Sequence, residues 1–134
     1  MNPEITAHFD RLERRLLESS AVSSYTLMRR EVTPTDGKVR IRAQLRDGGL
    51  LELLEYVALN IEGQVARLKY SYHWQNKNGI LVRRWDAAPH HPELPCAPHH
   101  VHLPDGDVEA VAEPPTATEV LVQIEASLSQ GQKE

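Results

Sequence analysis

Histidines are the residues of this chain best suited to chemistry, and most of them lie in one short segment. The chain has seven histidines. Five of them follow Trp85 and Asp86 closely, namely His90, His91, His99, His100 and His102. A sixth, His73, lies on the segment just before them. Imidazole titrates near neutral pH, so such a cluster can hold protonated and neutral rings at once, as general acid–base chemistry requires.

Prolines punctuate the same stretch, at Pro89, Pro92, Pro95 and Pro98. Proline fixes its own φ, pushes the preceding residue out of the helical region and removes a backbone donor. The stretch therefore cannot be a helix or a central strand. We expect residues 85–102 to form a stiff, extended loop that presents imidazoles.

Metal-independent cleavage of RNA is the reaction that needs these groups most directly. A base removes the proton of the 2′-hydroxyl, an acid protonates the leaving 5′-oxygen, and cations stabilise the charge on the phosphate. The predicted catalytic residues are His73, Asp86, His90, His91, His99, His100 and His102, with Asp86 orienting one ring. The predicted substrate-binding residues are Lys69, Arg83 and Arg84 for the phosphate, with Arg67 as a further cation, and Trp85, Trp74 or a tyrosine to stack on a base if exposed.

Two other interpretations of the histidines stay open. In an extended chain His100 and His102 point to one side, and His90, His91, Asp86 and Cys96 are close in sequence, a set that suits zinc or another divalent metal. The chain would then be a metal-binding or protein-interaction module without catalysis. Neither zinc-finger nor helical zinc-protease spacing is present, however. In the third interpretation the rings only lock the loop by bonding to its carbonyl groups. The acid–base hypothesis, which is our first, needs no cofactor.

The elements that must position these residues begin with a helix. Asn2 is a good helix cap and Pro3 is tolerated at the first helical position. One apolar stripe follows, formed by Ile5, Phe9, Leu12 and Leu16. The pattern predicts a helix that ends near Ser19, with His8 beside the stripe as a surface residue.

Apolar stretches and turn signals then predict an antiparallel meander of about five strands, over residues 22–32, 38–45, 50–59, 63–74 and 80–85. The pattern of residues 50–59 would also suit a helix, but the hairpin turns around it favour a strand. Asp36-Gly37 and Asn78-Gly79 are hairpin signals between them. One face of the second strand carries Lys38, Arg40 and Arg42, which is either a solvated face or a track for phosphates. His73 is expected to share a face with Arg67 and Lys69 of its own strand.

Beyond the histidine loop, a short edge strand is expected at 108–111. Thr116 and Glu119 have the spacing of a capping box, and the helix that they start should run to about residue 130. The sequence thus predicts one α+β domain over residues 1–134: an N-terminal helix, the meander, the His/Pro-rich loop and a C-terminal helix packed on the sheet.

Composition limits the classes of protein that fit. The formal net charge is −4, so any contact with RNA must come from a local basic face. The single cysteine, Cys96, excludes an intramolecular disulfide and fits a reducing compartment. No stretch has the length and apolar character of a membrane span or a signal peptide. We therefore expect a cytoplasmic protein.

Several blocks of sequence resemble the TumE-like family of small prokaryotic toxins. They are Tyr-Ser-Tyr-His-Trp-Gln at 70–75, Arg-Trp-Asp at 84–86, and the two Pro-His-His blocks at 89–91 and 98–100. The chain departs from the family pattern at Ala87, where the family has Asn, and at Ala97, where it has an aromatic residue. The resemblance implies the toxin of a toxin–antitoxin pair, and such toxins commonly cut RNA. It also implies a cognate antitoxin, typically a helix-turn-helix protein. A homodimer paired through an exposed sheet edge is a further expected assembly.

Overall fold

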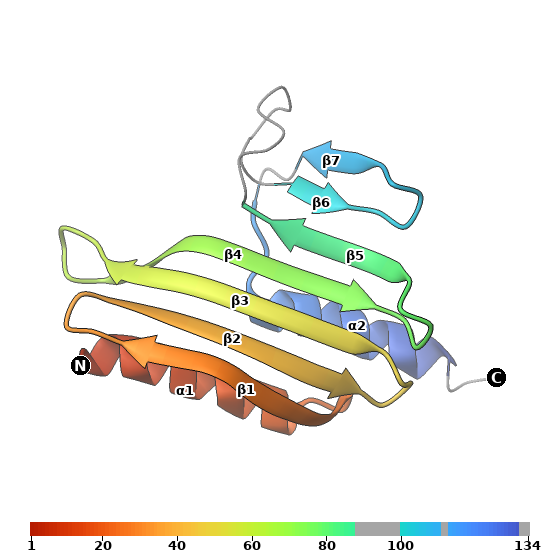
Figure 1. The fold of residues 1–134 in the computed structure, drawn as a ribbon, viewed down its shortest axis with the longest axis horizontal. Coiled ribbons are helices and arrows are strands. Elements are labelled where there is room, and N and C mark those ends of the chain that lie inside the picture. Colours follow the sequence, from red (N-terminus) through yellow and green to blue (C-terminus); the bar gives the residue numbers. More distant parts are fainter. Residues whose placement is uncertain (88–99, 111–112, 132–134) are drawn as a thin grey trace.

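The computed structural model describes residues 1–87, 100–110 and 113–131. Its elements in chain order are α1 (Pro3–Glu18), β1 (Val22–Val32), β2 (Asp36–Leu45), β3 (Leu50–Leu59), β4 (Val65–Gln75), β5 (Leu81–Asp86), β6 (His100–His102), β7 (Val108–Ala110) and α2 (Ala117–Gly131). The strands form one antiparallel sheet in the order β1 to β7, so that each strand pairs with its neighbours in sequence (Figure 1). The fold is α+β, as the sequence predicts.

Helix α1 forms where its cap and its apolar stripe predict it. The Asn2 side chain accepts hydrogen bonds from the backbone N–H groups of Glu4 and Ile5 at 2.9 and 3.1 Å. This capping satisfies two donors of the first turn that have no partner within the helix. The apolar stripe is buried, and the helix ends at Ser19.

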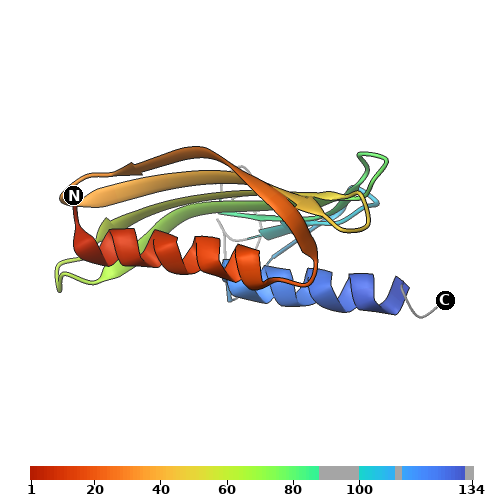
Figure 2. The same cartoon turned by 90° about the horizontal axis from the view of Figure 1, so that it is seen from below.

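Both helices cover the same face of the sheet, as Figure 2 shows from below. The core lies between them and the strands, and includes Phe9 of α1, Ile41 of β2, Leu53 of β3, Tyr72 of β4 and Leu121 of α2. In the described part of the chain the other face of the sheet has no helix over it, and we call it the open face. Neither described helix is long and apolar enough to cross a membrane.

The sheet has two more strands than the five of the predicted meander. His100–His102 is strand β6, antiparallel to β5, so the end of the expected loop belongs to the sheet. This is consistent with the prolines, since none lies between residues 99 and 103. Strand β7 lies at 108–110, where the sequence predicts an edge strand.

The first hairpin turns two residues earlier than its Asp-Gly signal suggests. Asp36 and Gly37 already belong to β2, and the turn lies at Thr33 to Thr35. A Cβ atom at Gly37 would lie 2.7 Å from a methyl group of Ile5 and 2.9 Å from the ring of Phe9. Glycine is therefore needed here for the close approach of α1, and not for a turn.

All four tyrosines should resist ionisation, which makes alkaline pH a test of the core. Burial raises the pKa of Tyr70 from 10.0 to about 12 and that of Tyr72 still further. The pKa of Tyr25 is raised by burial and by its hydrogen bond to Glu13, and the pKa of Tyr56 is raised by its hydrogen bond to Asp36 and then by burial. Above pH 10 the unfolded chain loses tyrosine protons that the folded chain keeps, so stability should fall as pH rises from about 10 towards 12.

The tyrosinate absorbance followed together with circular dichroism during an alkaline titration measures this effect. We expect the Tyr72 hydroxyl to ionise only as the chain unfolds. Ionisation of all four tyrosines near pH 10 in a chain that stays folded would contradict the arrangement of the core.

Candidate active site

Strand register brings polar residues from six strands into two adjacent rows across the open face. One row pairs Arg29, Arg40, Leu54, Ser71, Asp86 and His100 in succession from β1 to β6. The next row pairs Thr26, Arg42, Glu52, His73, Arg84 and His102. Directly opposed residues in a sheet have close Cβ atoms, so side chains far apart in sequence meet here. The predicted residues His73, Arg84, Asp86 and His102 thus come together.

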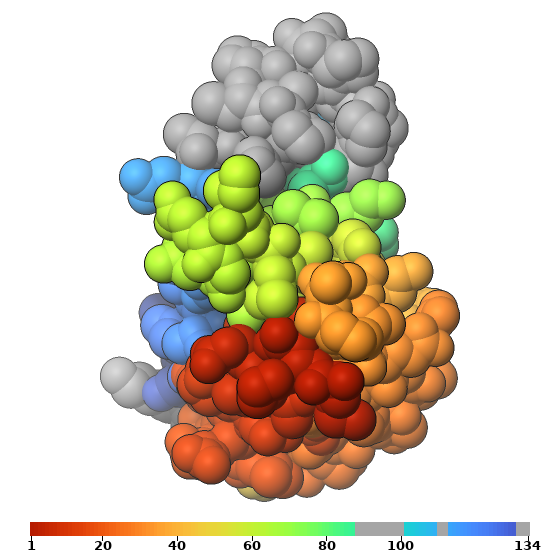
Figure 3. All heavy atoms as spheres, turned by 90° about the vertical axis from the view of Figure 1, so that its left-hand side faces the viewer, coloured from red at the N-terminus to blue at the C-terminus, as the bar shows by residue number. Residues whose placement is uncertain are grey.

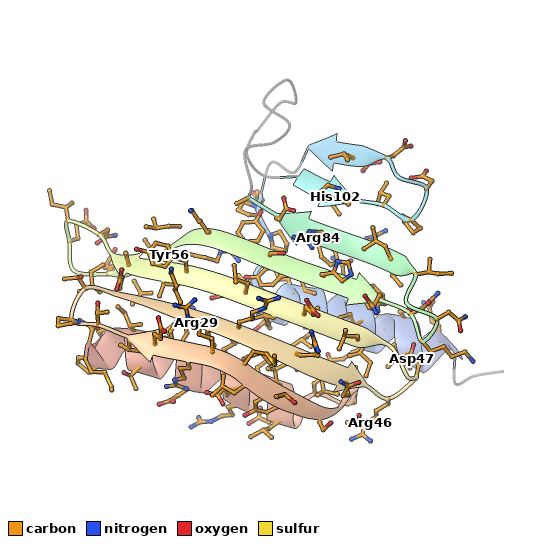
Figure 4. The ribbon with its side chains drawn as sticks, in the orientation of Figure 1. Arg29, Arg46, Asp47, Tyr56, Arg84 and His102 are labelled. Carbon is orange, nitrogen blue, oxygen red and sulfur yellow. The ribbon has the colours of Figure 1, made fainter. Side chains whose placement is uncertain are left out.

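Asp86 is at the centre of this group. The residue is 3% exposed, and Oδ2 accepts a hydrogen bond from Nε of Arg84 at 3.1 Å. The same oxygen lies 3.5 Å from Nε2 of His102 on the neighbouring strand. Figure 4 shows Arg84 and His102 on adjacent strands of the open face. The carboxylate therefore lies against both a cation and an imidazole.

His73 is held in one tautomer by two neighbours. Nη1 of Arg84 lies 3.4 Å from Nδ1 of His73, and arginine can only donate, so Nδ1 accepts. Nε2 is then the protonated nitrogen and donates to Oε1 of Gln75 at 3.1 Å. Both ring nitrogens therefore have partners. His73 therefore positions Arg84 in this arrangement.

The surroundings of the group are basic. The open face carries Arg29, Lys38, Arg40, Arg42, Lys69 and Arg84. Glutamates offset some of this charge, since Arg42 donates to Glu52 at 2.9 Å and Arg29 to Glu31 at 3.0 Å. A shallow hollow of about 230 Å³ lies among Arg40, Glu52, Ser71, His73 and Arg84. The chain thus combines a net negative charge with a face on which arginine and lysine predominate.

Tyr56 is the aromatic side chain of this face. It is half-buried, stands between Lys38 and Lys69 in a third cross-strand row, and donates its hydroxyl to Oδ2 of Asp36 at 2.8 Å. The Lys38 ammonium lies 5.6 Å from its ring centre. A hollow of about 470 Å³ adjoins these side chains.

Three predicted substrate-binding residues lie on the other face. Trp85 is 5% exposed in the core and Trp74 is buried beside it, so neither can stack on a base in this structure. Arg83 also belongs to the helix-covered face, where it donates to Gln123 of α2 at 3.0 Å. The predicted stacking role of Trp85 and phosphate role of Arg83 are therefore not supported by their positions.

Arg67 departs from the predicted face because β4 has a bulge. Tyr56 pairs with Lys69 and Val57 with Arg67, so Leu68 is an extra residue between them. A one-residue shift moves side chains to the opposite face. Lys69 stays on the open face with His73, as predicted, whereas Arg67 turns to the helix side and donates to the hydroxyl of Tyr72 at 2.6 Å.

The remaining predicted catalytic residues, His90, His91 and His99, lie outside the described residues, as does Cys96. Of His100 only the backbone is described, and it pairs with Asp86. Within residues 1–87, 100–110 and 113–131 no group of three or more histidine, cysteine or acidic side chains could hold a metal ion. Residues 88–99 follow Ala87, which is next to Asp86 in the chain, and precede His100, which pairs with Asp86. Both ends of that segment therefore adjoin Asp86.

Sequence reasoning missed a second polar group on the helix side. His8, expected to be a surface residue, places Nε2 2.8 Å from Oε1 of Glu55, which is 3% exposed. The signal was present in β3, where Leu51, Leu53, Glu55 and Val57 alternate towards the core. An acidic residue in a core-facing position calls for a buried partner.

Comparison with known proteins gives one family. No curated protein and no solved structure matched the chain. The family model described as Toxin TumE matches residues 12–131, a range that contains the whole sheet, α2 and every residue of the two rows. Over nearly its entire length, then, the chain belongs to the TumE family of toxins.

Proposed function

We propose that this chain is a ribonuclease toxin that cuts RNA without a metal ion, at the open face around Asp86. The supporting observation is the group of His73, Arg84, Asp86 and His102, which are joined by contacts of 3.1 to 3.5 Å. The group combines imidazoles, a cation and an orienting carboxylate, which are the components that this reaction needs. The family match adds that the chain belongs to a family of toxins.

Each member has a role that follows from its contacts. Asp86, 3.5 Å from His102, would stabilise that ring as an imidazolium and so provide the acid that protonates the leaving 5′-oxygen. Arg84, held between Asp86 and His73, would bind the phosphate and the negative charge that develops on it. His73 would position Arg84. The base that removes the 2′-proton would then come from His90, His91, His99 or His100.

The basic rows would bind the rest of the substrate. Arg40 and Arg42 extend from the reacting group towards β1 along the two rows, and Lys38 and Lys69 flank Tyr56 in the third. Arginine and lysine contacts to phosphates add affinity without reading sequence. Tyr56, in place of Trp85, would stack on a base. Single-stranded RNA is the substrate that suits such a face, because its bases are free to stack.

A toxin implies an antitoxin, and we propose that the cognate antitoxin is a helix-turn-helix protein that covers the open face. The setting would be the cytoplasm, where RNA is available. β1 lies at one edge of the described sheet, so a second copy pairing along that edge would give a homodimer. The antitoxin should compete with RNA, because both would contact the arginines of the two rows.

The ends of the RNA products distinguish this reaction from metal-assisted hydrolysis. Attack by the 2′-oxygen on phosphorus, with loss of the 5′-oxygen, leaves a 2′,3′-cyclic phosphate and a 5′-hydroxyl. The purified protein should produce these ends, and cleavage should persist after dialysis against EDTA because no step of the proposal uses a metal. Mass spectrometry of the products would identify them.

An RNA with a single 2′-deoxy nucleotide at the cut site is the matched control, and it should not be cut there. Cleavage of the deoxy substrate, or activity that EDTA removes and zinc restores, would contradict the proposal. The second result would favour a divalent metal bound by the histidines.

A further inference from the structure

The helix-covered face contains a second cluster of ionisable side chains, separate from the open face. Oε1 of Glu55 bonds to Nε2 of His8 at 2.8 Å, and Oε2 accepts from the hydroxyl of Tyr72 at 2.7 Å. That hydroxyl in turn accepts from Nη1 of Arg67 at 2.6 Å, and Nη1 also donates to the carbonyl of Pro115 at 2.6 Å. Four side chains from α1, β3 and β4 are thus linked in one network.

The network places charge where the sheet otherwise packs apolar residues. Glu55 lies between Leu53 and Val57 on the core-facing side of β3. Arg67 reaches the same side only because of the bulge in β4, and its guanidinium lies 4.2 Å from the ring centre of Tyr70. Burying ionised groups costs free energy even when they are paired, so their presence calls for an explanation beyond stability.

These groups open into a hollow of about 450 Å³ between α1 and the beginning of α2. His8 and Arg11 line it from α1, Glu55 and Arg67 from the sheet, and Leu12 and Val65 give it apolar surface. Figure 3 looks at this end of the molecule, where α1 (red), the β3–β4 turn (yellow-green) and the start of α2 (blue) meet. The His8 side chain is 30% exposed, so a solute can reach it.

The charge of the hollow favours an anion. Arg11 and Arg67 are always cationic, and His8 adds a third positive charge when it is protonated. Both oxygens of Glu55 are already engaged by His8 and Tyr72, and the carboxylate is buried beneath them. The first turn of α2 carries the Glu119 carboxylate, which accepts a hydrogen bond from the Thr116 backbone N–H.

We propose that this hollow is a second binding site, for the phosphate group of a phosphomonoester. Two guanidinium groups and an imidazole suit a phosphate dianion better than they suit a carboxylate ligand, which carries one negative charge. The volume exceeds that of phosphate itself, so the body attached to the phosphate would lie against Leu12 and Val65. The site is on the opposite side of the sheet from Arg84 and Asp86, and its existence does not depend on ribonuclease activity.

Titration with inorganic phosphate at constant ionic strength tests the proposal, with the histidine ring signals followed by NMR. The His8 signals, identified by their absence in His8→Gln, should shift and saturate at roughly millimolar phosphate. Arg11→Gln should weaken the binding about two- to fivefold, as expected for an exposed charge. Arg67→Gln should weaken it about tenfold or more, since a charge-assisted contact is lost.

Arg14→Gln is the matched control, because Arg14 is exposed on the same helix and does not line the hollow. It should leave the phosphate-dependent shift of the His8 signals unchanged. Absence of a His8 shift, equal weakening in Arg11→Gln and Arg14→Gln, or the same response to acetate would overturn the proposal.

Two further ligands identify the source of the phosphate. Tighter binding of adenosine monophosphate than of inorganic phosphate would indicate a free nucleotide. Tighter binding of a 5′-phosphorylated RNA oligomer, but not of its 5′-hydroxyl form, would indicate an RNA end. Either result, read from the His8 signals, supports the site, whereas an equal His8 shift with both oligomers argues against it.

Discussion

Replacing Asp86 by Asn should lower RNA cleavage by at least about a hundredfold, the usual range for losing correctly positioned acid–base groups. The amide keeps the shape of the side chain but removes the charge that holds Arg84 and faces His102. Growth arrest on induced expression should disappear with the activity. Cleavage rates of the purified variant, measured beside thermal unfolding, separate loss of chemistry from loss of fold.

Asp107→Asn is the comparison that makes this test specific. Asp107 is exposed in the turn between β6 and β7, and the substitution makes the same change of charge close to the site. Its rate should stay within about twofold of the wild type, as for most surface substitutions. Equal cleavage rates for the two variants would contradict a role for Asp86 in the mechanism. They would also contradict the proposal that the open face is the active site.

Replacing Glu55 by Ala should lower the free energy of unfolding by about 3 kcal/mol, at the low end for breaking a buried ionic network. The change leaves the hydroxyl of Tyr72 and Nε2 of His8 without their acceptor, and Arg67 without a nearby carboxylate. Urea denaturation of the two proteins gives the difference directly.

Glu52→Ala serves as the control on the same strand. Glu52 points to the open face, is 31% exposed and pairs with Arg42, so its loss should cost less than about 1 kcal/mol. A similar cost for both variants would show that the buried network adds no more than a surface ion pair. The loss of unfolding free energy in Glu55→Gln should fall between the losses in Glu55→Ala and Glu52→Ala, because the amide oxygen can still accept one hydrogen bond.

The sequence predicted the elements well where local signals were strong. The cap and stripe of α1 and the clean alternation of β2 gave bounds that agree with the structure within two residues. These features depend on residues close in sequence. The predicted turn at Gly37 was misplaced because this glycine is needed for the close approach of α1, and not for a turn. Helix α1 lies some thirty positions earlier in the chain.

The candidate site was predicted in part. His73, Arg84, Asp86 and His102 were among the predicted residues, and strand pairing brings all four together. Which cations would join them could not be predicted, because the bulge at Leu68 is a property of how β3 and β4 pair. Alternation alone predicted that Arg67 shares a face of the sheet with His73. One extra residue in β4 moves the Arg67 side chain to the other face.

The order of the strands has a consequence for synthesis on the ribosome. Every strand pairs with the one made just before it, so the sheet can grow hairpin by hairpin as the chain emerges, without waiting for distant partners. The reacting group spans β4, β5 and β6 and is complete only when His102 has been made. A nascent chain therefore lacks the proposed activity until about three quarters of it exist, and the ribosome that makes it is not exposed to a working toxin before then.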